Sequence, residues 1–178
     1  MKTLIVYYSF TQNNAALATM MQKRLDCEML RIETLRRRSA FSIFLDAAFG
    51  RKPAILKHNL TISNYEQIVF VGPIWMGKIA GPLKTFLSEE KGNIRRYSFI
   101  SVCGGLTGQK EKIEDELTSI VGSRPQSVCE LWVSEIVSEK VTKNAKNVSA
   151  YRIRSSELER FRTKIYEFCD VVESEVVK

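Results

Sequence analysis

A polar hexapeptide, residues 9–14, stands between a short apolar run and a segment whose apolar residues recur at helical spacing. Such a loop leaves a strand and enters a helix, where unpaired backbone N–H groups and the helix dipole favour an anion. The side chains of Ser9, Thr11 and Asn13 can add hydrogen-bond donors, and the hexapeptide contains no Lys or Arg. We therefore expect a phosphate site that binds mainly through neutral hydrogen bonds.

A second loop, residues 72–77, follows another apolar run and combines two glycines with an aromatic side chain and a thioether. The glycines permit unusual backbone angles and the close approach of a flat ligand. Trp75 offers a face for stacking, and Met76 offers a polarizable contact. The alternative, which stays open, is that Trp75 only covers the core.

A third loop, residues 103–105, offers small residues and free backbone N–H groups. These suit the edge of a heteroaromatic ring that is rich in carbonyl groups. No base, acid or cation stands beside Cys103 in the sequence to make its thiol a nucleophile, so we expect no covalent chemistry there.

The segments between these loops alternate between strand and helix patterns. Apolar runs predict strands at residues 4–8, about 28–35, 68–71, 97–103 and 128–133. Apolar residues at helical spacing predict helices that contain residues 17–25, 83–87, 113–121 and 158–172. Asn13 or Asn14 is expected to cap the first of these helices.

Strands that alternate with helices require right-handed crossovers and a parallel sheet with helices on both faces. We therefore predict an α/β protein, a three-layer α/β/α sandwich around a five-stranded sheet. The three loops all follow the carboxyl ends of strands, where open α/β sheets bind ligands. The same site should therefore contain all three.

The bulk composition is that of a globular protein, with 44% apolar and 26% charged residues among 178. We expect one domain over residues 1–178. No apolar run approaches the roughly 20 residues of a membrane span, and no secretory signal is present, so we expect a cytoplasmic protein. Four separated cysteines, most of them inside apolar runs, predict buried, reduced thiols at every position except Cys103, for which burial is left open. A single histidine, His58, without a cluster of ligand spacing predicts no metal site.

On these residues the chain resembles the flavodoxin family, whose members bind FMN, and the resemblance covers almost the whole chain. The family's first loop carries a T/S-x-T-G-N-T-like sequence that wraps the FMN phosphate. Its positions are held here by Ser9, Thr11, Gln12, Asn13 and Asn14. Gln12 replaces the usual glycine and Asn14 the usual threonine, and both keep hydrogen-bonding groups.

A second stretch, residues 65–75, resembles the family's Y-D-x-I-x-x-G-x-P-x-W segment, and residues 81–87 resemble the helix entry that follows it. The resemblance implies a sheet of strand order 2-1-3-4-5 and a flavin ring between two loops, with Trp75 or Met76 against a ring face. The residues implied beside the ring are Pro73, Ile74, Trp75, Met76, Gly77, Cys103, Gly104 and Gly105.

The function that we expect is electron transfer through bound FMN, in which no catalytic side chain is assigned because the cofactor handles the redox step. A carrier of the flavodoxin type usually presents an acidic surface to its redox partner protein, whereas this chain has a net charge of +7. The alternative is an NAD(P)H-dependent oxidoreductase with a small quinone or flavin as acceptor. Residues 77–84 also resemble part of the NADPH-dependent FMN reductases.

A phosphorylatable receiver domain needs an acidic pair after the first strand and an aspartate at the end of the third, and the sequence has Ser9-Phe10 and Gly72-Pro73 there. This class is therefore set aside. A flavin-free module that binds an anion or a partner protein stays open.

The basic residues form scattered clusters without the aromatic pattern of an RNA-recognition motif, so we expect no nucleic-acid partner. One cluster, residues 36–38, precedes an aromatic helical segment, residues 41–49, within the long connection 34–67. We expect this segment to be a lid packed over the core. Contact with a membrane surface or a partner is the alternative.

Overall fold

The structure is a computed structural model and describes residues 1–105, 108–137 and 150–174. Its strands are β1 (Thr3–Tyr7), β2 (Glu28–Arg31), β3 (Gln67–Val71), β4 (Ile74–Trp75), β5 (Lys78–Ile79), β6 (Tyr97–Cys103) and β7 (Val128–Trp132). Its α-helices are α1 (Asn13–Leu25), α2 (Ala40–Phe49), α3 (Gly81–Glu90), α4 (Gln109–Val121), α7 (Ser155–Leu158) and α8 (Arg162–Glu173). Short 3-10 turns are η1 (Ile62–Asn64), η2 (Lys91–Asn93), η3 (Val133–Glu135) and η4 (Glu159–Phe161).

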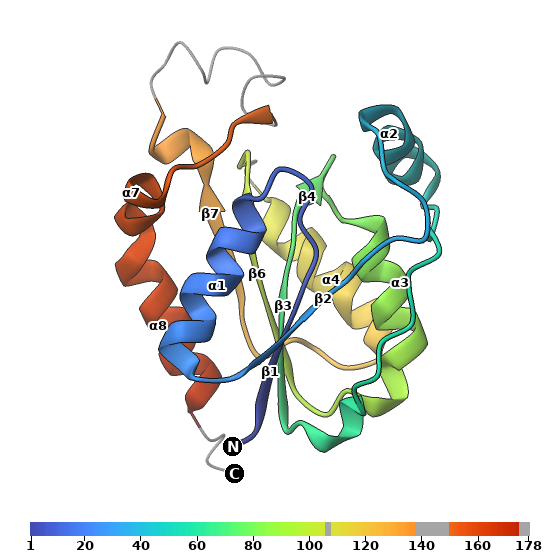
Figure 1. Cartoon of the computed structure of the whole chain (residues 1–178), viewed down its shortest axis with the longest axis horizontal. Helices are drawn as coiled ribbons and strands as arrows, with labels where there is room; N and C mark the ends of the chain where they lie inside the picture. The colour runs from blue at the N-terminus through green and yellow to red at the C-terminus, as the bar shows by residue number, and fades with distance from the viewer. Residues whose placement is uncertain (106–107, 138–149, 175–178) are drawn as a thin grey trace.

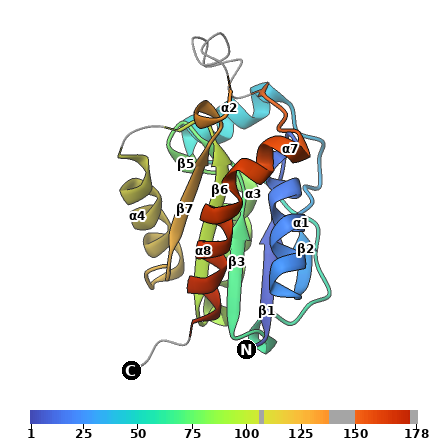
Figure 2. The same ribbon diagram turned by 90° about the vertical axis from the view of Figure 1, so that its left-hand side faces the viewer.

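Five parallel strands form the central sheet in the order β2-β1-β3-β6-β7, and helices cover both of its faces (Figures 1 and 2). This confirms the predicted α/β/α sandwich and its strand order, since β6 and β7 are the fourth and fifth strands of the sheet. Because all five strands are parallel, the loops that leave β1, β3 and β6 emerge at the same edge of the sheet.

The central strands are buried on both faces, which explains their continuous apolar runs. Alternate residues point to opposite sides: Leu4 and Phe70 pack with α3 and α4, whereas Ile5 and Val69 pack with α1 and α8. The apolar residues at helical spacing within 158–172 are all buried, but they are shared among α7, η4 and α8: Leu158, Phe161, Ile165, Phe168 and Val172. None of the helices in the described ranges is long and apolar enough to cross a membrane.

The second strand is shorter than expected and ends at Arg31 rather than near residue 35. After Ile32 the chain leaves the sheet, because Thr34 forms an antiparallel bridge with Ile55 and the Leu35 N–H donates to the Ala54 carbonyl at 3.0 Å. The start of the long connection is therefore bonded to residues 54–55 of the same connection and not to the sheet.

The lid expected at residues 41–49 is a helix, α2, but its aromatic side chains do not cover the core. Phe41 and Phe49 are each 70% exposed, and Phe44 is 52% exposed. The helix contacts α3 at the carboxyl edge of the sheet (Figure 1). The expectation was wrong because helical spacing shows which residues share a face, and not toward which side that face turns.

The first helix also differs from the sequence expectation, because neither Asn13 nor Asn14 caps it. Both residues lie inside its first turn, and the cap position is Gln12, which makes no side-chain cap bond. Asn14 is buried and bonds to β6 instead: its Nδ2 donates to the Val102 carbonyl at 3.2 Å, and its Oδ1 accepts from the Val102 N–H at 2.9 Å. The amide thus joins α1 to the central sheet.

Replacing Asn14 by Ala should lower the free energy of unfolding by about 2–4 kcal/mol, because a buried N–H and a buried carbonyl of Val102 lose their partners. Urea unfolding of the ligand-free protein measures this change. The matched control is Asn93→Ala, which removes an exposed bond to Glu90 and should cost less than about 0.5 kcal/mol. Equal costs for the two variants would contradict the role of Asn14.

Candidate functional site

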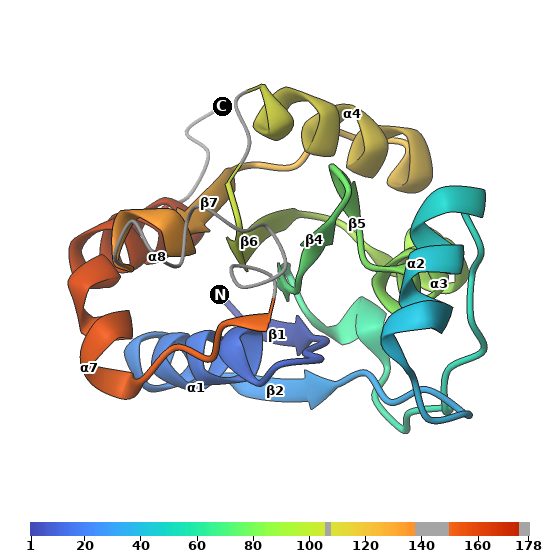
Figure 3. The ribbon, with the colours of Figure 1, turned by 90° about the horizontal axis from the view of Figure 1, so that it is seen from above.

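The candidate site lies at the carboxyl edge of the sheet, where the three loops singled out in the sequence emerge. Figure 3 looks onto this edge and shows the β4–β5 hairpin between β1 and α4. Contacts between aromatic rings join the first two loops: Trp75 meets Tyr8 edge-on at 6.0 Å between ring centroids and Phe10 at 6.4 Å. The first and second loops are thus in direct contact.

The first loop leaves a hydroxyl without a partner. Ser9 Oγ is buried and has no hydrogen-bond partner among the described residues. Thr11 is half-buried, and Gln12 is exposed with a left-handed backbone, φ 74°. No side chain caps α1, so the first backbone N–H groups of this helix have no side-chain acceptor. They follow Ser9 closely in the chain. Uncapped N–H groups and an unpaired hydroxyl together suit an anion.

The side-chain amides of this loop are already engaged. Asn13 Nδ2 donates to the Tyr151 carbonyl at 2.7 Å, and Asn13 Oδ1 accepts from the Ile153 N–H at 3.0 Å. Together with the Asn14 bonds to Val102, this accounts for both amides. Asn13 and Asn14 therefore hold the first turn of α1 in place, and only their backbone N–H groups remain to meet an anion.

The second loop folds into a hairpin that the sequence did not predict. Trp75 pairs with Lys78 across a tight turn in which Met76 and Gly77 both have positive φ, 53° and 72°. Such a pair of left-handed residues is typical of a two-residue hairpin turn. Ile74 is buried, Trp75 is half-buried and Met76 is 64% exposed. The hairpin therefore places one aromatic face and one thioether at the edge, next to the first loop.

An ion pair anchors this hairpin to two helices. Glu116 of α4 accepts from the Ile79 N–H at 2.8 Å and pairs with the buried ammonium of Lys84 on α3. At the base of the hairpin, the Ala80 N–H donates to the Pro73 carbonyl at 3.1 Å. The Glu116–Lys84 ion pair and these backbone hydrogen bonds thus fix the base of the hairpin, and with it the position of Trp75 and Met76.

The third loop is built around a partly buried polar network. Gln109 Nε2 donates to Glu130 Oε1 at 2.9 Å and lies 3.7 Å from Cys103 Sγ, and Trp132 Nε1 donates to Glu130 Oε2 at 2.9 Å. At Gly105, which has φ 84°, a Cβ would come within 2.6 Å of the Trp132 ring, so only glycine fits. Gly104 is exposed beside it.

Cys103 is an unreactive thiol in this setting. Burial, and next the Glu130 carboxylate, raise the pKa of Cys103 to about 12. A thiol with such a pKa stays protonated near neutral pH and is a poor nucleophile. All four cysteines are free, and Cys27 and Cys129 are half-buried rather than buried.

Sequence reasoning missed the residues that support the loops, namely Lys84, Gln109, Glu116, Glu130 and Trp132. One signal was available: Glu130 is a carboxylate in the middle of the apolar run 128–132, where a charge needs a buried partner. Lys84, Gln109 and Glu116 come from α3 and α4, helices whose rotation the sequence does not fix, and Trp132 is the last residue of β7.

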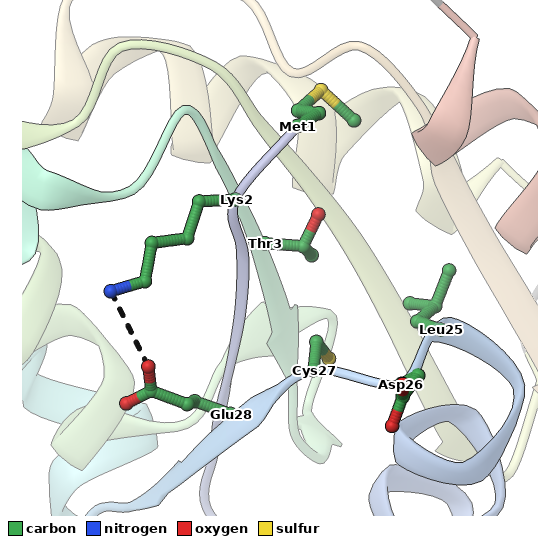
Figure 4. Close-up of a pocket in the computed structure, with 7 residues that line it drawn as sticks. All are labelled: Met1, Lys2, Thr3, Leu25, Asp26, Cys27 and Glu28. Carbon is green, nitrogen blue, oxygen red and sulfur yellow. Dashed lines mark ion pairs between the residues drawn. The ribbon is translucent and has the colours of Figure 1, made fainter.

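A hollow at the opposite, amino edge of the sheet contains none of the predicted residues (Figure 4). It is lined by Met1, Lys2, Thr3, Leu25, Asp26, Cys27 and Glu28. Its charged residues include a pair, Lys2 Nζ to Glu28 Oε1 at 3.4 Å, with both side chains more than half exposed. Across residues 1–105, 108–137 and 150–174, no group of three or more His, Cys, Asp or Glu side chains is placed to hold a metal ion.

No protein-family model and no curated protein matches this chain. Solved structures do. A flavoprotein from Lactobacillus acidophilus, solved in complex with FMN, superposes with a TM-score of 0.64 at 20% identity, covering 72% of this chain and 92% of that one. A flavodoxin, WrbA-like protein from Agrobacterium tumefaciens gives 0.54 at 16% identity, with 96% of each chain covered. An NAD(P)H:quinone oxidoreductase from Methanothermobacter marburgensis gives 0.56 at 10% identity, covering 99% of this chain and 98% of that one. These likenesses show that the chain has a flavodoxin-like fold.

Replacing Glu116 by Gln should lower the free energy of unfolding by about 2–3 kcal/mol, because the buried Lys84 ammonium loses its carboxylate while the Ile79 N–H keeps an acceptor. Adding Lys84→Met should recover most of the loss by removing the uncompensated charge. Denaturant unfolding of both variants checks this.

The control for this prediction is Glu114→Gln on the same helix. Glu114 pairs with Arg124 at 3.7 Å, and the Arg124 side chain is 74% exposed, so the variant should change stability by less than about 0.5 kcal/mol. If Glu116→Gln cost no more than Glu114→Gln, Glu116 would not anchor the hairpin.

Proposed function

We propose that this chain binds FMN at the carboxyl edge of its sheet and transfers electrons through it. The observation that carries the proposal is the unpartnered, buried hydroxyl of Ser9 at the uncapped start of α1. The fold supports it, since open α/β sheets bind ligands at this edge. The flavoprotein from Lactobacillus acidophilus, which shares the fold, was solved in complex with FMN.

The phosphate fits the first loop through hydroxyl and backbone donors. Ser9 Oγ and the Thr11 hydroxyl would donate to its oxygens, together with the backbone N–H groups of Gln12, Asn13 and Asn14 at the start of α1. The amide side chains of Asn13 and Asn14 would hold these N–H groups in position rather than contact the phosphate. No Lys or Arg lies in residues 9–14, so the site would be electrically neutral.

The flavin ring would lie between the second and third loops, the position that the resemblance to the flavodoxin family implies. Residues 73–77 would flank one side, with Trp75 or Met76 against a ring face, and residues 103–105 the other. When bound, FMN supplies one- or two-electron transfer. The chain's own part is to hold the ring and limit its access to water, because no side chain in residues 73–77 or 103–105 is charged near neutral pH.

Comparing FMN with riboflavin tests the phosphate site directly. We expect FMN to bind at least about a hundredfold more tightly, and Ser9→Ala to weaken FMN by about tenfold without changing the affinity for riboflavin. Fluorescence titration of the ligand-free protein measures both affinities. Because the Ser9 hydroxyl has no partner in the free protein, Ser9→Ala should leave its stability unchanged or raise it by about 1 kcal/mol.

The control is Thr19→Ala, which removes an exposed hydroxyl from α1, away from its amino end, and should leave both affinities unchanged. Equal binding of FMN and riboflavin would reject the phosphate site. Absence of binding by both, with retained binding of inorganic phosphate, would favour the flavin-free anion-binding module instead.

A second candidate is an NAD(P)H-dependent oxidoreductase with a small quinone or flavin as acceptor. The net charge of +7 favours this candidate, since a basic protein attracts an anionic dinucleotide. A basic protein would repel the basic partner proteins that an acidic carrier attracts. The Methanothermobacter marburgensis enzyme with the same fold is an NAD(P)H:quinone oxidoreductase. This activity would use the same FMN site and the same loops.

Anaerobic mixing of the FMN-loaded protein with NADPH distinguishes the two candidates. A reductase should lose its flavin absorbance with NADPH alone, whereas a carrier should keep it until a redox partner protein is added. We expect any reduction by NADPH to slow as salt screens the basic surface. The measurement is the rate at which the flavin absorbance falls after rapid mixing with NADPH, at low and at high salt.

A further inference from the structure

The helix α2 has the opposite orientation to an ordinary surface helix, because its large apolar side chains are exposed and its acidic side chain is buried. Its large apolar residues Phe41, Phe44 and Phe49, at positions i, i+3 and i+8, share the outer face and are 52–70% exposed. The opposite face carries Ile43 and the helix's one acidic residue, Asp46, and both are buried. The apolar stripe therefore faces water.

The helix is fixed in this orientation from its inner side. Asp46 pairs with Arg38, whose Nη2 also donates to the Ser42 carbonyl at 3.2 Å. A reciprocal capping box between Ser39 and Ser42 begins the helix, and Gly50 ends it with φ 64°. Rotating the aromatic residues inward would break the buried Arg38–Asp46 pair, so the exposed face is a stable feature of the surface.

The exposed charges of the segment that carries α2, residues 34–57, have a single sign. Between residues 34 and 57 the one acidic residue is Asp46, which is buried and paired. The exposed charged residues are all basic: Arg36, Arg37, Arg51, Lys52 and Lys57. Arg51 lies over the Phe49 ring, 5.6 Å from its centroid. Aromatic residues flanked by basic ones are typical of helices that lie in the interface of an anionic membrane.

We propose that the outer face of α2 docks this protein onto a bilayer with anionic headgroups. Phe41, Phe44 and Phe49 enter the boundary between headgroups and acyl chains, and the neighbouring arginines meet the headgroup charges. A second copy of the chain does not suit this face, because a symmetric contact would bring like-charged arginines together. The docking needs no bound flavin, so it stands independently of the proposed redox function.

Sedimentation with lipid vesicles tests the docking. The protein should pellet with phosphatidylcholine vesicles that contain phosphatidylserine and not with phosphatidylcholine alone, and high salt should weaken the binding. The double variant Phe41→Ser, Phe44→Ser should abolish it. Arg36→Gln with Arg37→Gln should weaken it by roughly tenfold, since each basic residue contributes to the attraction.

The matched charge control is Lys91→Gln with Arg95→Gln, which also removes two exposed positive charges, but near the amino edge of the sheet. This pair should leave vesicle binding unchanged. Circular dichroism of every variant confirms that it is folded, which we expect because all the substituted side chains are exposed.

A fluorescent variant locates the contact. Phe44→Trp should gain a blue shift in its emission when anionic vesicles are added, beyond the signal of the parent protein with Trp75 and Trp132. No vesicle binding at low salt would overturn the proposal in favour of an acidic protein partner. Equal binding to neutral vesicles, or binding without a blue shift, would also overturn it.

Discussion

The start of α1 is held by side-chain amides, and the geometry of the whole carboxyl edge depends on this. An asparagine amide carries a donor and an acceptor side by side, so it can pair with the N–H and C=O of a backbone segment. Asn14 does this with Val102 of β6, and Asn13 with Tyr151 and Ile153. Because both amides bond away from the first loop, the backbone N–H groups at the start of the helix are left for a ligand.

The second loop is held by a different interaction, in which one carboxylate pairs with an ammonium and also accepts a hydrogen bond from a backbone N–H. Lys84 is buried, and its charge is tolerated because Glu116 lies against it and also accepts from Ile79. A buried pair of this kind adds little net stability, but separating its partners leaves an uncompensated buried charge, which favours the arrangement that keeps them together. Here that arrangement sets the hairpin, and the edge-on contacts of Trp75 with Tyr8 and Phe10 set its distance from the first loop.

The sheet could be predicted from the sequence because its strands are buried on both faces and read as uninterrupted apolar runs, such as residues 68–71. The role of Asn14 could not, because its partner Val102 is 88 residues away in the chain and local preference alone favours a cap. The hairpin was missed since each of its strands has two residues, too few for a periodic pattern. The three loops share one edge of the sheet because its strands are parallel, as the sequence predicted, but three of the supporting side chains, Lys84, Gln109 and Glu116, come from helices whose rotation the sequence does not fix.

Backbone strain gives a separate reason to regard these loops as a site. In the described ranges, the residues other than glycine with positive φ are Gln12, Asp26 and Met76. Asp26 ends α1, where aspartate tolerates the left-handed region. Gln12 and Met76 have no such preference, and each left-handed residue costs about 1–2 kcal/mol that glycine would avoid. Both strained residues lie in the first two loops, one before the uncapped helix and one at the hairpin tip. Strain that persists at two neighbouring loops, where glycine would remove it, is the pattern found at ligand-binding sites.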